Sequence, residues 1–163
     1  EPKLLIADEP TTALDVTVQA GILDLLQQQQ RERHMSMILI THDLGVVAGR
    51  TDEIAVMYAG KLVERSSTKA LFANTRMPYT QALMESIPHL DQPTHTRLKT
   101  ISGHPPNLIN PPLGCRFAPR CSRADEHCQE AEPSLRSDDG ADHTYACWRP
   151  VGQPPTRAAA EVS

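Results

Sequence analysis

Two short apolar segments, each followed at once by polar residues, constrain the fold of this chain more than any other feature. The first spans residues 4–7 and ends in Asp8-Glu9-Pro10, and the second spans residues 36–41 and ends in His42-Asp43. A continuous apolar run of this length is typical of a strand buried on both faces, as in a parallel sheet. Proline lacks the backbone N–H that a sheet requires, so the first strand must end by Pro10.

The stretch between these segments has the pattern of one helix over residues 16–33. Val18, Ile22, Leu25 and Leu26 recur at helical spacing, and Asp15 stands where a residue would cap the helix N-terminus. Strand, helix and strand in this order predict a βαβ unit with parallel strands. The fold class is therefore α/β.

A second set of elements is expected up to residue 87. Residues 44–50 predict a short helix, and Tyr58-Ala59-Gly60 predicts the turn of a hairpin between two strands. These strands are expected at residues 53–57 and 61–64. Two further short amphipathic helices are expected at residues 68–73 and 78–86.

The composition changes after Pro88, since seven prolines lie between Pro88 and Pro119. Proline disfavours regular helix and central strand, so this stretch is expected to be irregular. We expect four regions: 1–87 as an α/β part, 88–113 as a proline-rich connection, 114–150 as a small irregular module with four cysteines, and 151–163 as a disordered tail.

Composition narrows the class of function. A formal net charge of −4 offers no basic footprint for nucleic acid. The longest apolar runs are far too short to cross a bilayer, and no signal-peptide pattern opens the chain. The first residue is Glu1, which suggests a piece of a longer protein.

Asp8, Glu9 and His42 follow two strands of the predicted sheet and should meet at one edge. One carboxylate there can hold Mg²⁺, and the next can orient or deprotonate an attacking water. A neutral imidazole can hydrogen-bond a phosphate oxygen or that water. Each residue alone is more often a solvated turn or surface residue, but their combination in this order favours a phosphate-processing site.

The quoted residues resemble motifs of the ABC ATPases. Residues 4–11 resemble the Walker B segment, Ala13-Leu14-Asp15 the D-loop, and Thr41-His42-Asp43 the H-loop. The resemblance implies the C-terminal part of a P-loop NTPase domain that uses ATP and Mg²⁺. By position, Asp8 would be the Mg²⁺-side carboxylate, Glu9 the catalytic base, Asp15 a contact to the opposing ATPase subunit, and His42 the sensor of the γ-phosphate.

Further segments are similar to one branch of that family. Residues 10–20 and 55–60 are similar to the peptide and nickel importer branch, and residues 77–83 with the cysteine module resemble the C-terminal extension of dipeptide and oligopeptide permease ATP-binding subunits. This implies an energy-coupling subunit of a bacterial importer, peripheral on the cytoplasmic face of the inner membrane. Implied partners are a second ATPase subunit, membrane permease subunits and, indirectly, an extracytoplasmic peptide-binding protein.

Two motifs of such ATPases do not occur in this sequence. It has no phosphate-binding G-x-x-x-x-G-K-[ST] loop and no Leu-Ser-Gly-Gly-Gln type signature. We therefore expect the chain alone not to hydrolyse ATP, and its two core strands to expose apolar faces for lack of partner strands. The alternatives are a non-catalytic regulatory module that binds metal or an Fe–S cluster, and the ATPase subunit of a nickel importer.

Four cysteines follow the spacing Cys115-x5-Cys121-x6-Cys128-x18-Cys147. Four thiolates can bind Zn²⁺ or a [4Fe–4S] cluster, although disulfides or free thiols fit the spacing as well. The family resemblance implies the [4Fe–4S] cluster, in a structural or redox-sensing role.

The neighbours of the cysteines carry further expectations. Nearby arginines should stabilise thiolates by their charge: Arg116, Arg120, Arg123 and Arg149. The histidines of this region, His127 and His143, are expected to be solvent-exposed, and Trp148 is expected to cover a small core.

Overall fold

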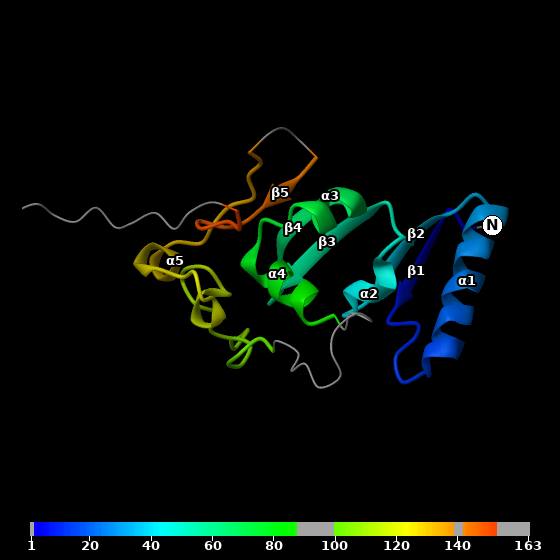
Figure 1. Cartoon of the computed structure of the whole chain (residues 1–163), viewed down its shortest axis with the longest axis horizontal. Helices are drawn as coiled ribbons and strands as arrows, with labels where there is room; N and C mark the ends of the chain where they lie inside the picture. The colour runs from blue at the N-terminus through cyan, green and yellow to red at the C-terminus, as the bar shows by residue number, and fades with distance from the viewer. Residues whose placement is uncertain (1, 88–99, 139–141, 153–163) are drawn as a thin grey trace, which may run out of the picture. The chain divides into compact units, whose positions relative to one another are not determined.

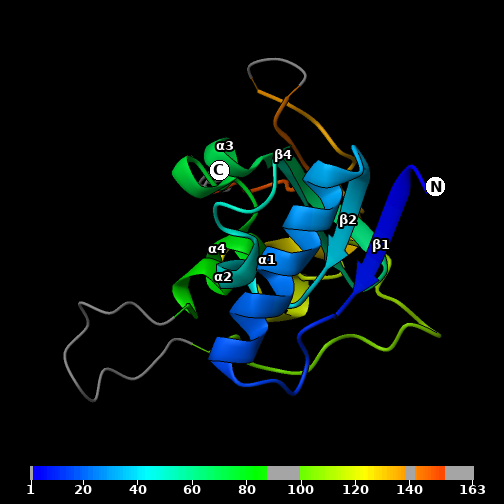
Figure 2. The same cartoon turned by 90° about the vertical axis from the view of Figure 1, so that its right-hand side faces the viewer.

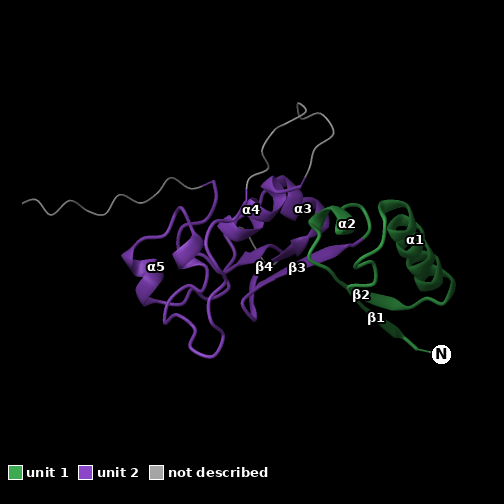
Figure 3. Cartoon of the chain, turned by 90° about the horizontal axis from the view of Figure 1, so that it is seen from below, with its two compact units in different colours: residues 1–50 green, residues 51–163 purple. Residues whose placement is uncertain are grey.

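The computed structural model describes residues 2–87, 100–138 and 142–152. It contains two compact units, Glu1–Arg50 and Thr51–Ser163 (Figure 3). Most of the expected disordered tail, from residue 153 on, lies outside the described residues, as does the 88–99 part of the expected proline-rich connection.

The first unit is a βαβ unit followed by a short helix, as the sequence predicts. Its elements are β1 (Leu4–Asp8), α1 (Val16–Glu32), β2 (Ser36–Ile40) and α2 (Leu44–Val47) (Figure 1). The two strands pair in parallel, with Ile6 opposite Ile38 and Asp8 opposite Ile40. Figure 2 shows β1 and β2 side by side, with α1 running next to them.

Burial in this unit differs from the prediction that both strand faces are covered. Four apolar strand residues are 45% to 60% exposed: Leu4, Ile6, Ile38 and Ile40. The sequence also predicts that β1 and β2 expose apolar faces for lack of partner strands, and that prediction is confirmed. On α1 the buried residue is Leu23 rather than Leu25, which is 51% exposed, because positions two apart lie on nearly opposite sides of a helix.

The second unit is built on an antiparallel sheet in the order β3-β4-β5. Its strands are β3 (Glu53–Tyr58), β4 (Lys61–Ser67) and β5 (Thr144–Tyr145), and its helices are α3 (Thr68–Ala73), α4 (Pro78–Glu85), the 3₁₀ turn η1 (Ala118–Arg120) and α5 (Glu126–Glu130). The predicted hairpin is confirmed. Its turn has positive φ at Ala59 (48°) and Gly60 (80°), the backbone twist that suits tight hairpins.

The third strand, β5, is absent from the sequence prediction. It pairs antiparallel with β4, with Tyr145 opposite Glu64, and Ala146 N donates to Val63 O at 2.8 Å. The hairpin and the cysteine-bearing residues therefore belong to one compact unit. Among the residues that the structure describes, no helix is long and apolar enough to cross a membrane.

Candidate functional site

Glu9 follows β1 directly and contacts His42, which lies beyond the end of β2. Nδ1 of His42 is 3.1 Å from Oε1 of Glu9, and Thr12 Oγ1 donates to Oε2 of Glu9 at 2.8 Å. The backbone helps to place this carboxylate, because Glu9 N donates to Ile40 O at 2.9 Å and Glu9 has a φ of 44°. The left-handed conformation is unfavourable for glutamate, so this turn is a strained feature at the edge of the sheet.

The charge state of Glu9 follows from these contacts. The hydrogen bond from Thr12, and then that from His42, lower the pKa of the Glu9 carboxyl below its usual value. Both side chains are open to solvent, with 45% of Glu9 and 75% of His42 exposed. Glu9 is therefore an ionised, accessible acceptor at neutral pH, with its two oxygens held in a defined orientation.

The other two predicted site residues of this unit lie close in sequence but have different surroundings. Asp8 is the last residue of β1 and is exposed at the strand end. Asp15 caps α1: its Oδ1 accepts from Thr17 N and Val18 N, both at 3.0 Å. The predicted N-cap is confirmed, and the Asp15 carboxylate is already engaged within its own chain.

The second candidate site is a pocket in the cysteine-bearing part of the second unit, which we call the cysteine pocket. All four cysteines are free thiols, so the disulfide alternative does not describe this structure. The pocket is lined by Cys115, Cys121, Cys128 and Cys147, together with Met77, Pro78, Phe117, Ala118, Arg123, Ala124, Trp148 and Arg149. The structure thus brings together four residues that the sequence spreads over 33 positions, from 115 to 147.

A close backbone contact forms one side of this pocket. Cys115 N donates to Cys128 O at 2.8 Å. A Cβ placed on Gly114 would lie 2.4 Å from the carbonyl oxygens of Cys128 and Gln129. Only glycine permits this approach, so Gly114 lets the segment around Cys115 pack against α5, which carries Cys128.

Burial dominates the acidity of the thiols. It raises the pKa of Cys147 to about 12 and that of Cys128 to about 11, and it raises the pKa values of Cys115 and Cys121 as well. Without a bound metal, the thiols are therefore protonated at neutral pH.

The prediction that arginines stabilise thiolates here holds for Arg123 at Cys121 but does not describe the main contacts of the four guanidinium groups. Their guanidinium groups bind backbone oxygens or a carboxylate instead: Arg116 binds Ala59 O, Arg120 binds Ser102 O (2.9 Å), Arg123 binds Arg149 O (3.1 Å), and Arg149 binds Asp125 Oδ2 (2.7 Å). The charge of Arg123 does lower the pKa of Cys121, but burial outweighs it. The four arginines therefore cross-link segments of the second unit through hydrogen bonds to carbonyl oxygens and a carboxylate.

Two histidines and the tryptophan of this region differ in their surroundings. His127 is exposed, as predicted, and its ring centroid lies 4.5 Å from that of Trp148. Trp148 lines the pocket and donates its Nε1–H to Ala131 O at 2.9 Å. The expectation that His143 is solvent-exposed is wrong. Its side chain is only 19% exposed, and its Nε2 lies 2.8 Å from Oε1 of Glu64.

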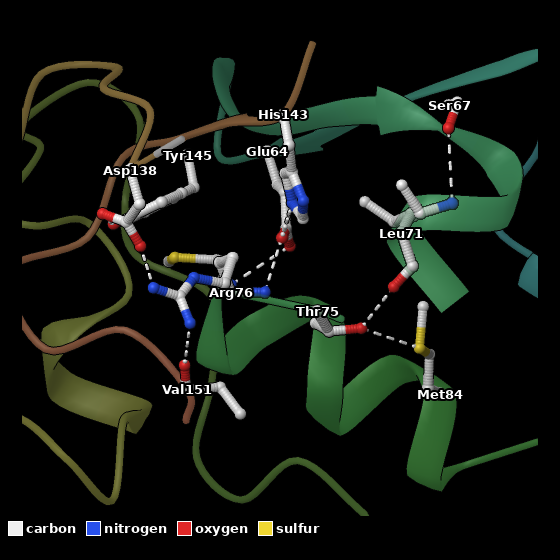
Figure 4. Close-up of polar contacts among 12 residues, drawn as sticks. Glu64, Ser67, Leu71, Thr75, Arg76, Met84, Asp138, His143, Tyr145 and Val151 are labelled. Atoms are coloured by element: carbon white, nitrogen blue, oxygen red, sulfur yellow. Dashed lines mark hydrogen bonds and ion pairs between the residues drawn. The ribbon is translucent and has the colours of Figure 1, made fainter. Parts of the chain in front are cut away.

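Sequence reasoning missed Glu64, whose carboxylate is completely buried. It accepts hydrogen bonds from Arg76 N at 2.6 Å and Met77 N at 3.1 Å, besides its contact with His143 (Figure 4). No spacing rule indicates a buried carboxylate in the second arm of a hairpin. The available signal was a charged residue on a strand in which Val63 and Ser66 are also buried, since a glutamate at a buried position needs hydrogen-bond donors.

Relatives of this chain are found among known transport proteins. Residues 63–128 match the family described as the C-terminal region of oligopeptide/dipeptide transporters. The dipeptide transport ATP-binding protein DppD of Bacillus subtilis is 51% identical over 150 residues, which is 91% of this chain and 44% of that protein. The oligopeptide transport ATP-binding protein OppD of Haemophilus influenzae is 55% identical over 147 residues, 90% of this chain and 45% of that protein.

A third relative, OppD of Mycobacterium tuberculosis, is 50% identical over 149 residues, 91% of this chain and 24% of that protein. The chain thus spans less than half the length of the curated relatives it matches.

Proposed function

Because this chain belongs to the ATP-binding proteins of dipeptide and oligopeptide transport, we propose that the edge formed by β1 and β2 is the hydrolytic half of an ATP site. The whole protein would be an energy-coupling ATPase subunit of a bacterial peptide importer. The observation that carries this proposal is the contact between Glu9 and His42 at the carboxyl ends of two parallel strands, where open α/β sheets bind ligands.

Each residue at this edge has a distinct part in the proposal. Glu9 is ionised and accessible, so it can accept a proton from, or orient, an attacking water. His42 holds Glu9 on one side through Nδ1, and with both ring nitrogens protonated it could also donate from Nε2 to a phosphate oxygen. Asp8 is the carboxylate that would hold Mg²⁺, which neutralises phosphate charge when bound. Asp15 stabilises the start of α1 and would contact a second ATPase subunit.

The chain by itself is proposed to be inactive. Its sequence contains no G-x-x-x-x-G-K-[ST] segment, whose backbone N–H groups and lysine would hold the phosphates. Positioning of the γ-phosphate against the water accounts for most of the catalysis in such enzymes, so a base alone has nothing to act on.

A chimera tests the hydrolytic role. This chain would replace the matching 45% of OppD from Haemophilus influenzae, and ATP hydrolysis would be measured. Glu9→Gln should lower the rate by about 100-fold or more while nucleotide binding persists, because a positioned base typically contributes at least that much. Glu53→Gln, an exposed carboxylate on β3, is the matched control. A Glu9→Gln chimera as fast as its parent would refute the role.

The partners and the substrate rest on the same relatives. The names of the relatives refer to dipeptides and oligopeptides, which supports a peptide over nickel. A second ATPase subunit, membrane permease subunits and, indirectly, an extracytoplasmic peptide-binding protein complete the proposed importer, with this protein peripheral on the cytoplasmic face of the inner membrane.

We further propose that the cysteine pocket holds a [4Fe–4S] cluster, with Zn²⁺ as the alternative. Four free thiols line one pocket, which is the donor set of either group. In the described residues no three His, Cys, Asp or Glu side chains converge closely enough to hold a single ion. The preference for a cluster over a lone ion rests on the resemblance of the cysteine module to that of peptide permease ATPases.

When bound, such a group supplies structural cross-linking or a redox response, not hydrolysis. Binding would also deprotonate four thiols whose pKa values burial raises, so it should release protons. Anaerobic purification with iron, sulfide and zinc analysis tests this proposal. A brown protein with about four irons per chain is expected. One zinc per colourless chain would favour Zn²⁺, and metal-free thiols would refute both.

A further inference from the structure

Glu64 on β4 binds two parts of the chain that are remote from it in sequence. Its buried carboxylate accepts hydrogen bonds from the backbone N–H groups of Arg76 and Met77, which precede α4. On its other side it meets Nε2 of His143, 79 residues further along the chain (Figure 4). A buried carboxylate that loses such donors costs far more than an exposed one, so all three contacts should be retained together.

Both of these parts form walls of the cysteine pocket. Met77, which is 1% exposed, and Pro78 line the pocket from the start of α4. Cys147 follows His143 by four residues, beyond β5. The three other thiols lie on a different segment, in which a hydrogen bond from Cys115 N to Cys128 O joins the residues after Gly114 to α5.

Arg76 ties the segment that carries Cys147 at two further places. Its Nη1 donates to Val151 O at 3.0 Å, and its own carbonyl accepts from Val151 N at 2.8 Å. Its Nη2 pairs with the carboxylate of Asp138, to which the hydroxyl of Tyr145 also donates. Glu64 and Arg76 therefore hold this segment both before and after the cysteine.

We infer that Glu64 is a positioning residue for the cysteine pocket. Through its contacts with the backbone of Met77 and the side chain of His143, Glu64 holds the thiol of Cys147 against the three other thiols. What fills the pocket rests on the function proposed above, but the placement of the thiols does not. The carboxylate thus links the hairpin and the start of α4 to the segment that carries Cys147.

The test labels the four thiols of the full 163-residue chain with iodoacetamide in its metal-free state, and mass spectrometry gives each rate. In Glu64→Gln, labelling of Cys147 should rise about tenfold relative to that of Cys121, because local opening of one segment exposes its own thiol first. The matched control is Glu53→Gln, whose carboxylate pairs with Arg65 at 2.8 Å on the same hairpin but is 59% exposed. Its labelling ratio should equal that of the wild type.

An equal rise of all four rates in a Glu64→Gln chain that keeps its folded circular dichroism spectrum would overturn the inference. His143→Gln gives a second reading should Glu64→Gln not fold, since it leaves the two backbone contacts of Glu64 in place. It should raise the same ratio by a smaller factor, and an unchanged ratio would likewise overturn the inference.

Co²⁺ titration separates this inference from the proposed metal function. Wild-type and Glu53→Gln chains should show the intense thiolate-to-cobalt absorption, and Glu64→Gln should lose Co²⁺ faster with an altered spectrum. A wild-type chain that binds neither Co²⁺ nor an iron–sulfur cluster would refute the metal function, and the labelling ratio would then decide on Glu64 by itself. A Glu64→Gln chain with the wild-type ratio and spectrum would overturn the positioning role.

Discussion

Oε1 of Glu9 and Nδ1 of His42 lie 3.1 Å apart, although 33 residues separate them in the chain. The parallel pairing of β1 and β2 produces this contact, because it places the ends of both strands at one edge of the sheet. The contact and the hydrogen bond from Thr12 leave Glu9 with a lowered pKa while it stays open to solvent. Removal of either donor should therefore raise the pKa of the Glu9 carboxyl.

Removal of the Thr12 hydroxyl should raise the pKa of the Glu9 carboxyl. Thr12 is the largest cause of the lowered value, and Thr12→Val keeps the shape of the side chain without the donor. Carboxyl ¹³C NMR titration measures the effect. Thr17→Val, at an exposed position on α1, is the control and should not move the Glu9 titration.

The sign of the accompanying pH effect is fixed by the same shift. A carboxyl with a lowered folded-state pKa adds stability above its unfolded value, and that contribution is lost as the pH falls through the folded value. The wild type should therefore lose more stability than Thr12→Val on acidification below about pH 4. Equal acid transitions would contradict this linkage.

Asp15→Ala should destabilise the chain by about 1 kcal/mol, the usual cost of a lost N-cap. The Asp15 carboxylate accepts two backbone N–H groups at the start of α1, and alanine leaves both without this acceptor. Asparagine can accept the same bonds, so Asp15→Asn should retain most of the stability. Urea unfolding followed by circular dichroism compares the three chains, and a loss in Asp15→Asn as large as in Asp15→Ala would argue against capping as the cause.

Two glycine-to-alanine substitutions should change the free energy of unfolding in opposite directions. A Cβ on Gly114 would lie 2.4 Å from two backbone oxygens, so Gly114→Ala should cost roughly 2 kcal/mol through overpacking. Gly21 lies inside α1, and a Cβ added there would meet nothing within 4 Å, so Gly21→Ala should gain up to about 1 kcal/mol of helix stability. Thermal unfolding of both variants checks the pair, and stabilisation by Gly114→Ala would show that the segment around Cys115 can separate from α5.

The metal-free chain should lose stability in alkali. Burial raises the pKa of Cys147 to about 12 and that of Cys128 to about 11, from an ordinary value of 9.0. A raised folded-state pKa adds stability that is complete below the unfolded value and is lost as the pH rises through the folded value. Urea midpoints should fall between pH 9 and pH 11, and Cys147→Ala should weaken that dependence. A flat profile in the wild type would contradict the burial of these thiols.

Local features of the first unit could be read from the sequence. The apolar runs that become β1 and β2, the cap at Asp15 and the parallel pairing depend on neighbouring residues and on chain order. Chain order also implied that Glu9 and His42 would meet. The buried face of α1 was not predicted as well: Leu23 is buried and Leu25 is 51% exposed, because positions two apart lie on nearly opposite sides of a helix.

In the second unit, the amino-acid sequence by itself determined the hairpin, the helices around it and the presence of four candidate metal ligands. Only the tertiary structure decided that β5 joins β4, that four thiols share one pocket, and that Glu64 and His143 meet across 79 residues. It also decided that the four arginines donate to backbone carbonyls and a carboxylate, while Arg123 still lowers the pKa of Cys121. The physical reason is that a periodic pattern reports the burial of a local segment, whereas the partner of a buried charge is set by which distant donors the packed chain brings to it.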